Sequence, residues 1–214
     1  MMFTKCKYFF FLGSIQGQEE ILTTEKEKFL RDVCIICDTR EQRNEHIIQQ
    51  LDKLGINHSR KKLAYGDYSF KIGEYDFSLL YAVERKSGIE ELWGNVTKDR
   101  ERFEAEIKRM SAISHTATLI IENCRDREYL REYSLSEKQM TTQNRKVQEI
   151  GKVIDGTLQS WQSPNKYGLS IHYADVQSQT APLLLSLFYY YWKNFQELIQ
   201  PKKKKSKKIP QNVE

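Results

Sequence analysis

Two short segments near the middle of the chain, GDYSF at residues 66–70 and VERKSG at residues 83–88, carry the pattern from which fold and site can be predicted. Both segments read as strands, and the turn residues between them favour an antiparallel pair. Successive side chains on a strand point to opposite faces of the sheet, so Glu84 and Lys86 share one face. Asp67 opens the partner strand, which would bring its carboxylate opposite Glu84.

A further acid is predicted to lie near this pair. Asp38 ends VCIICD, a continuously apolar run that is typical of a strand buried on both faces. Three acids and Lys86 would then meet at one edge of a sheet. Carboxylate oxygens are the ligands that Mg²⁺ prefers, the bound metal activates water toward a phosphodiester, and a lysine can orient that water. The alternative is a surface ion pair worth about 0–1 kcal/mol and without a functional role.

Helical and extended patterns alternate on both sides of these strands. The clearest helix spans residues 43–54, where apolar residues recur at helical spacing and Gly55 follows as a C-terminal cap. The other patterns predict a helix at 95–113, a strand at 116–123, a helix from about 140 to 161, a strand at 169–176 and a helix at 180–199. This order predicts an α/β fold in which helices cover both faces of a central mixed β-sheet.

The positive charge of the chain is concentrated at its C-terminus. The 214 residues have a formal net charge of +5, and residues 201–214 contain six Lys and one Glu, so the rest of the chain is neutral. The sequence predicts an N-terminal extension (1–32), one globular domain (33–199) and a polybasic tail (200–214) that we expect to be disordered. Such a tail favours DNA, RNA or anionic membranes without choosing among them; a tail that only improves solubility is the alternative.

Cysteine and histidine usage argues against disulfide or zinc chemistry. The four cysteines have no framework spacing, and Cys34 and Cys37 alternate to opposite faces of a strand, so we expect buried thiols and an intracellular setting. That setting would be the cytoplasm or nucleoid in a prokaryote or phage and the nucleus in a eukaryote. The histidines at 46, 58, 115 and 172 show no ligand spacing and are interpreted as incidental. No apolar run reaches the roughly 18 residues of a membrane span, and no small-molecule cofactor is expected.

The order of the motifs resembles that of a known family. GD at 66–67, ERK at 84–86 and an acid a few residues later resemble the XPF-type nuclease domain, a branch of the PD-(D/E)XK restriction-like superfamily. DTRE at 38–41 and TATLIIEN are similar to two further segments of that domain, and the similarity covers about residues 33–195. The resemblance implies a restriction-endonuclease-like fold and a Mg²⁺-dependent DNA endonuclease, with Mn²⁺ as a possible replacement.

Carried over position by position, the resemblance implies roles for five residues in a catalytic site. Asp67 and Glu84 would bind the metal, and Lys86 would work beside the attacked phosphate. Asp38 would supply a further acid. Arg85, which alternation puts on the opposite face, would brace the site or reach DNA.

One position departs from the family pattern. Where the family has Asp four residues after the Lys of ERK, this chain has Glu90, and Glu91 follows it. Glu90 is one methylene longer and is predicted as the third metal ligand, but Glu91 could take that role, and the sequence does not choose between them. No room remains for the paired helix-hairpin-helix modules of many relatives, so specificity for branched DNA is not implied by the resemblance alone.

Contacts with DNA are expected from basic residues that need only meet phosphates. The candidates are Arg40 and three residues of the helix predicted at 95–113, namely Lys98, Arg100 and Arg102. Acidic residues on that helix offer the alternative of a balanced, solvated surface. We expect a nuclease acting on structured or branched DNA in repair, recombination or mobile-element processing. A homodimer is one expected form of this nuclease. A non-catalytic DNA-binding or scaffolding subunit is the alternative.

Overall fold

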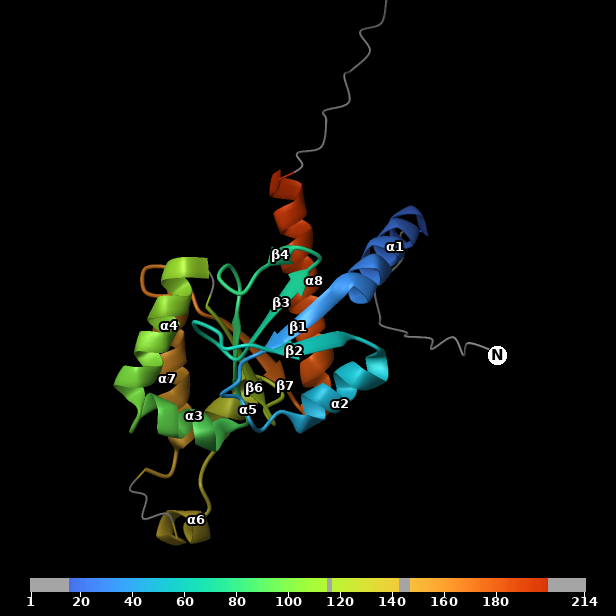
Figure 1. The fold of residues 1–214 in the computed structure, drawn as a ribbon. Coiled ribbons are helices and arrows are strands. Elements are labelled where there is room, and N and C mark those ends of the chain that lie inside the picture. The colour runs from blue at the N-terminus through green and yellow to red at the C-terminus, as the bar shows by residue number, and fades with distance from the viewer. Residues whose placement is uncertain (1–15, 115–116, 143–146, 200–214) are drawn as a thin grey trace, which may run out of the picture.

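One mixed β-sheet forms the centre of the molecule. The structure, a computed structural model, describes residues 16–114, 117–142 and 147–199 (Figure 1). Its seven strands have the order β2-β1-β3-β5-β6-β7, with β4 paired to β3. Strand β3 is antiparallel to β1 and β5, whereas β1–β2, β5–β6 and β6–β7 are parallel pairs. The strands are β1 (Val33–Cys37), β2 (Asn57–Arg60), β3 (Tyr68–Ile72), β4 (Tyr75–Asp76), β5 (Val83–Lys86), β6 (Thr118–Glu122) and β7 (Ser170–Ala174).

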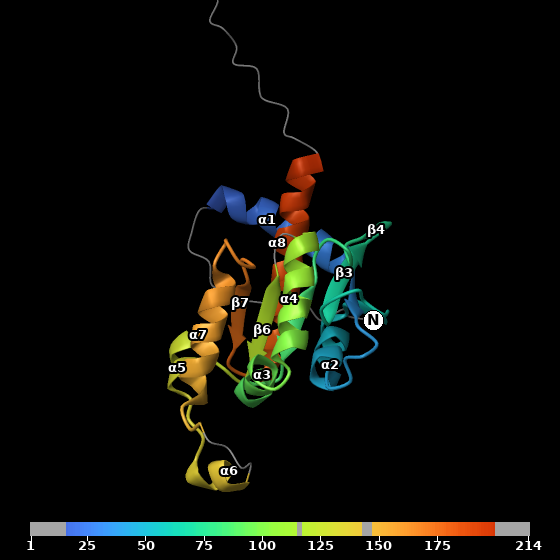
Figure 2. The same cartoon turned by 90° about the vertical axis from the view of Figure 1, so that its left-hand side faces the viewer.

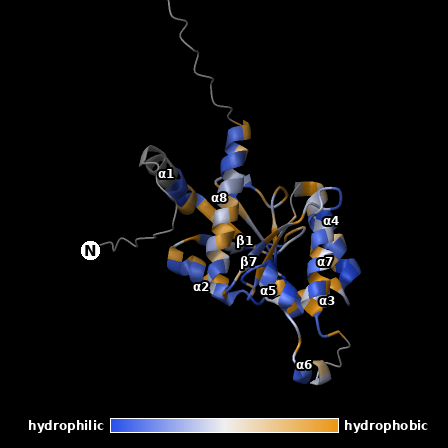
Figure 3. Cartoon of the chain, turned by 180° about the vertical axis from the view of Figure 1, so that it is seen from behind, coloured by the Kyte–Doolittle hydropathy of each residue, from blue (hydrophilic) through white to orange (hydrophobic). Residues whose placement is uncertain are grey.

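Helices cover both faces of this sheet (Figures 1 and 2). One face is covered by α1 (Gln16–Asp32), α2 (Glu45–Leu54) and α8 (Thr180–Ile199), and the other by α3 (Ile89–Val96), α4 (Arg100–Ser114), α5 (Arg127–Glu132) and α7 (Ile150–Gln162). The short helices η1 (Gln177–Gln179) and α6 (Glu137–Thr142) complete the list. The helices carry both hydrophilic and hydrophobic residues (Figure 3), as amphipathic layers require. The predicted α/β fold is confirmed.

The carboxyl ends of several strands lie at one edge of the sheet. Because β1 and β5 are both antiparallel to β3, they run in the same direction, and β6 continues parallel to β5. The residues that end these strands, and the residue that precedes β3, therefore come together at that edge. Asp38, Asp67 and Glu122 occupy such positions. Strands with shared direction thus gather acids that are far apart in the chain.

The helix predicted at residues 43–54 is confirmed as α2. It ends at Gly55, which has a left-handed φ of 66° and donates its backbone N–H to the carbonyl oxygen of Asp52. Two of the residues that define its apolar stripe, Ile47 and Leu51, are fully buried against the sheet. Tertiary packing of this stripe stabilises a helix that would be marginal alone.

The prediction of a single helix from about residue 140 to residue 161 is wrong. The described residues form two helices there, α6 and α7. Backbone groups near the start of α7 bond to the segment after α5 instead of continuing a helix: Leu135 N–H donates to the carbonyl of Gln148, and Gly151 N–H donates to the carbonyl of Tyr133, each at 3.0 Å. Gly151 lies so close to α5 that a Cβ would fall 2.0 Å from the carbonyl oxygen of Leu130. These long-range contacts override the apolar periodicity.

Helix α1 joins the core although its residues precede the predicted domain. Phe29 is 1% exposed, and its ring centroid lies 5.4 Å from Tyr189 and 5.5 Å from Trp192 of α8. Residues 1–15 and the predicted polybasic tail lie outside the described residues. In the part of the chain that the structure describes, no helix combines the length and apolarity of a membrane span.

Candidate active site

A glycine places Asp67 beside β5. Gly66 has a left-handed φ of 68°, and a Cβ on it would lie 3.1 Å from the Cβ of Ala82 and 3.2 Å from the carbonyl oxygen of Val83. A larger residue would be strained in conformation and in space. Asp67 N–H donates to the carbonyl of Val83 at 2.9 Å. The close passage of the two backbones explains why Gly precedes Asp in the GD motif.

The alternation predicted for β5 is confirmed. Lys86 Nζ lies 2.6 Å from Glu84 Oε1, so the two side chains share a face, and both are nearly buried, with 8% and 3% of the residue exposed. Lys86 Nζ also lies 4.7 Å from the centroid of the Phe103 ring, which shields it from water. The other Glu84 oxygen, Oε2, is buried and has no hydrogen-bond partner among the described residues. This pair is therefore not a solvated surface ion pair.

The charges at this site disturb one another. Burial, and then the negative charge of Glu84, raise the pKa of Asp67 well above its ordinary value. Burial also raises the pKa of Glu84, although the nearby Lys86 opposes this change. Burial alone would lower the pKa of Lys86, but Glu84 and Asp67 reverse the effect and raise it. Lys86 is thus protonated, and two carboxylates compete for its single positive charge.

Asp67 and Glu84 fit a hard divalent cation. Mg²⁺ in proteins is often held by one or two carboxylates and keeps several waters, so a dedicated cage is not required. The described residues contain no group of three or more His, Cys, Asp or Glu side chains arranged as a metal cage. The unpartnered Oε2 of Glu84 is the kind of donor that a cation would engage, and a second positive charge would relieve the repulsion between the two acids.

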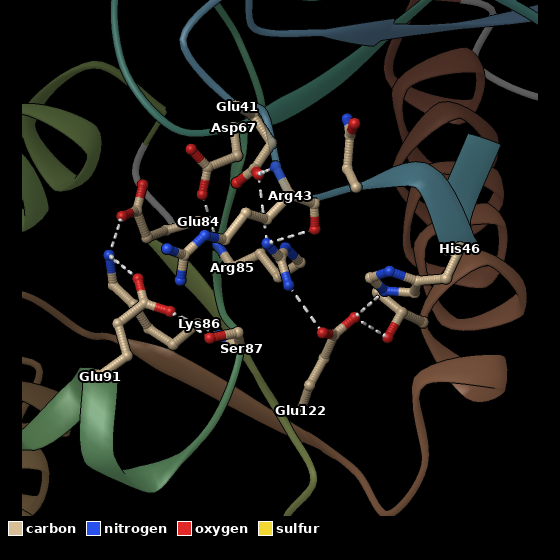
Figure 4. A network of polar contacts seen from close by, with 12 residues as sticks. Glu41, Arg43, His46, Asp67, Glu84, Arg85, Lys86, Ser87, Glu91 and Glu122 are labelled. Atoms are coloured by element: carbon tan, nitrogen blue, oxygen red, sulfur yellow. Dashed lines mark hydrogen bonds and ion pairs between the residues drawn. The ribbon is translucent and has the colours of Figure 1, made fainter.

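The structure separates Glu90 from Glu91. Glu90 Oε1 accepts hydrogen bonds from Tyr133 Oη at 3.2 Å and from Gln139 Nε2 at 2.9 Å, so it faces α5 and α6. Glu91 Oε1 lies 3.9 Å from Lys86 Nζ, while its Oε2 accepts from the backbone and hydroxyl of Ser87 (Figure 4). Adjacent residues on a helix point about 100° apart, so only one can face the site. The geometry brings Glu91, and not Glu90, to Lys86.

Both oxygens of Asp38 are occupied by neighbouring donors. Its Oδ1 accepts from the backbone and Nε of Arg40, each at 2.7 Å, and its Oδ2 accepts from the backbone N–H of Leu63 at 2.6 Å and from Arg40 Nη2 at 3.0 Å. Burial would raise the pKa of Asp38, but these hydrogen bonds outweigh it and lower the pKa. The Arg40 side chain, predicted to contact DNA, is 59% exposed while it makes this pair.

We expect Asp38→Asn to destabilise the fold by about 3 kcal/mol, because an amide cannot accept from every donor around a buried, charge-assisted network. Urea denaturation would measure the loss. Asp76→Asn is the matched control, since the Lys61–Asp76 pair is exposed and worth at most about 1 kcal/mol. If Asp38→Asn instead leaves stability unchanged but stops DNA cleavage, the catalytic role predicted for Asp38 is the correct one.

Sequence reasoning missed a buried network on the other face of β5. Arg85 Nη1 donates to Glu122 Oε2 at 2.6 Å, and Nη2 donates to Glu41 Oε1 at 3.2 Å. Glu122 Oε1 in turn lies 2.8 Å from Nε2 of His46, so this histidine, which was interpreted as incidental, takes part in the network. One signal was available in the sequence: Glu122 ends a buried strand, as the acid after VCIIC does.

The basic residues predicted to bind DNA are exposed. Lys98, Arg100 and Arg102 belong to the segment 97–102, which lines a shallow polar hollow at the start of α4. Arg100 lies 3.5 Å from a carboxylate oxygen of Glu104, and Arg102 lies 3.8 Å from one of Asp99. Such exposed pairs are weak and can exchange partners. The residues remain accessible to a phosphate.

Fold and site together define the class of the protein. A mixed sheet flanked by helices, with acids and a lysine on neighbouring strands, is a restriction-endonuclease-like α/β architecture. The ERCC4 domain family matches residues 37–187, more than half of the chain, and the chain belongs to this family of XPF-type nuclease domains.

Solved structures agree with this assignment. XPF from Aeropyrum pernix has a TM-score of 0.51 and 19% sequence identity, with 77% of this chain and 71% of that chain covered. A complex of XPF from Aeropyrum pernix with DNA has the same TM-score and identity, covering 75% of this chain and 66% of that chain. At this identity the likeness shows the fold. No curated protein sequence matches the chain.

Proposed function

We propose that the chain is a divalent-metal-dependent endonuclease that hydrolyses phosphodiester bonds in DNA. The observation that carries the proposal is the meeting of Asp67, Glu84 and Lys86, with one Glu84 oxygen left without a partner among the described residues. Membership in the ERCC4 family and the fold shared with an XPF–DNA complex support DNA as the substrate.

In this proposal the two acids and the lysine have different tasks. Asp67 and Glu84 would hold the ion, Mg²⁺ or Mn²⁺. A bound divalent ion supplies Lewis acidity, which stabilises charge on a phosphate and lowers the pKa of a water. Lys86, kept protonated by its neighbours, donates hydrogen bonds to the attacking water or to an anionic phosphate oxygen. The ring of Phe103 keeps bulk water from its Nζ, which strengthens these interactions.

The DNA backbone would cross the exposed start of α4. Lys98, Arg100 and Arg102 are the proposed phosphate contacts, because recognition of the backbone needs positive charge and little geometry. Arg40 is a weaker candidate since its guanidinium is held by Asp38. A homodimer, and a preference for structured or branched DNA, remain predictions.

A cleavage assay tests the proposed function. The purified chain would be incubated with labelled nicked, flapped and forked DNA in Mg²⁺ or in EDTA, beside Glu84→Ala. We expect cleavage of at least one substrate in Mg²⁺ and none in EDTA or with the variant. Cleavage that persists in EDTA contradicts the metal requirement. Binding of all three substrates without cleavage would favour the non-catalytic, scaffolding alternative.

The two neighbouring glutamates give a matched pair of variants. Glu91→Gln is expected to lower kcat about tenfold, because it removes the carboxylate beside Lys86, whereas Glu90→Gln should stay within about twofold of the wild type. Steady-state kinetics on the best DNA substrate would measure both. The opposite ranking would return the third-acid role to Glu90, as the family pattern predicts.

A further inference from the structure

Glu122 joins four elements of the fold at one buried carboxylate. It ends β6, is 0% exposed, and receives Nη1 of Arg85 from β5 on its Oε2. Its Oε1 accepts from the hydroxyl of Thr180, the first residue of α8, at 2.5 Å and lies 2.8 Å from Nε2 of His46 in α2. Figure 4 shows Glu122 and His46 on one side of Arg85. A carboxylate with so many partners fixes the position of each of them.

Arg85 connects this network to the candidate active site. Its side chain is 3% exposed and lies on the face of β5 opposite the carboxylate–lysine pair, but its backbone N–H donates to Oδ2 of Asp67 at 2.8 Å. Glu84 and Lys86 flank it on a four-residue strand. A shift of Arg85 would therefore move the hydrogen bond that orients Asp67 and both neighbouring side chains.

We propose that Glu122, supported by His46, is a positioning residue for the active site on the opposite face of the sheet. It holds Arg85, and through Arg85 it orients Asp67 and Glu84, the two residues that would hold the cation. This inference rests on the proposed function, and it assigns α2 and α8 a part in the chemistry. The competing interpretation is that the network only stabilises the core.

Glu122→Gln tests the proposal because it keeps the side-chain volume and removes the charge. Asp155→Asn is the matched control: Asp155 is also buried, accepts from Arg127 at 2.7 Å and 3.1 Å, and joins α5 to α7. Three quantities would be measured at a temperature where circular dichroism shows each variant folded: kcat, KM for DNA, and the Kd for Mn²⁺ by calorimetry without DNA.

Glu122→Gln should lower kcat at least about tenfold and weaken Mn²⁺ binding at least about fivefold, while KM for DNA stays within about twofold. Asp155→Asn should leave all three quantities within about twofold of the wild type. If Glu122→Gln does not fold, His46→Ala replaces it. We expect His46→Ala to lower kcat and Mn²⁺ affinity by a smaller factor, and we expect His46→Gln, which keeps an N–H donor, to restore both.

If the wild type cleaves DNA, either of two results would overturn the proposal. The first is a folded Glu122→Gln that has the kcat and the Mn²⁺ affinity of the wild type; if Glu122→Gln does not fold, the same result in a folded His46→Ala counts. The second is an equal loss of kcat and Mn²⁺ affinity in Asp155→Asn, which would reveal a general effect of stability. If the wild type does not cleave DNA, the proposed function fails, but calorimetry still decides this inference. Weaker Mn²⁺ binding by Glu122→Gln than by the wild type then upholds the positioning role. The role is refuted if the variant binds Mn²⁺ as tightly as the wild type, or if the wild type does not bind Mn²⁺.

Discussion

Asp67→Asn is expected to lower the rate of DNA cleavage by about 10³-fold and, in EDTA, to raise the melting temperature. The amide oxygen of Asn can still accept from the backbone of Arg85, while the negative charge that repels Glu84 disappears. Each kcal/mol of relief corresponds to about 2–4 °C for a chain of this size. Cleavage kinetics and thermal unfolding in EDTA measure the two effects.

Asp52→Asn serves as the control for this variant, because Asp52 is an exposed carboxylate of α2 that pairs with His58. It should change neither quantity. If Asp67→Asn cleaves slowly and also has a lower melting temperature in EDTA, the carboxylate of Asp67 stabilises the fold, and its charge is not destabilising. A variant that cleaves normally would remove Asp67 from the proposed mechanism.

Lys86→Met is expected to lower cleavage by about 10²–10³-fold while Mn²⁺ binding is kept or strengthened. The methionine fills the space beside Phe103. Without the ammonium, the negative charge of Glu84 and Asp67 is less compensated, and a bound cation stabilises it more strongly. In EDTA the variant should have a lower melting temperature, because the buried carboxylate of Glu84 loses its ion-pair partner. Added Mn²⁺ should restore the melting temperature.

Lys71→Met, which changes an exposed lysine of β3, is the matched control and should behave as the wild type. The decisive comparison is between metal binding and cleavage. If Lys86→Met loses both together, the lysine acts only by holding the carboxylates in place. If it cleaves at the wild-type rate, charge stabilisation by Lys86 has no part in the reaction.

Local rules predicted the directions of the side chains on β5, whereas the proposal of an active site there also needed the resemblance to a family. Alternation along β5 placed Glu84 and Lys86 on one face, and the structure puts them 2.6 Å apart. The apolar runs identified the buried strands, and Gly55 marked the end of α2. These features depend on neighbours within a few residues, so a single sequence contains the information.

The remaining features depend on partners that are distant in the chain. The hydrogen bonds of Asp38 come partly from Leu63, and those of Glu122 come from residues 76 positions before and 58 positions after it. Apolar periodicity also does not report the backbone bonds that separate α6 from α7. The choice between Glu90 and Glu91 required the direction in which α3 leaves β5. Such contacts follow from the fold and are not visible in local patterns.

Strand β5 places three consecutive charged residues under cover, with Glu84, Arg85 and Lys86 only 3%, 4% and 8% exposed. Glu84 and Lys86 pair with each other, and Arg85 pairs with Glu122 and Glu41, so replacing one residue leaves a buried charge without compensation. For protein engineering, this strand is best transferred as a unit together with the carboxylates that face it. Changes in substrate preference are better sought in the exposed start of α4, where side chains can be exchanged one at a time.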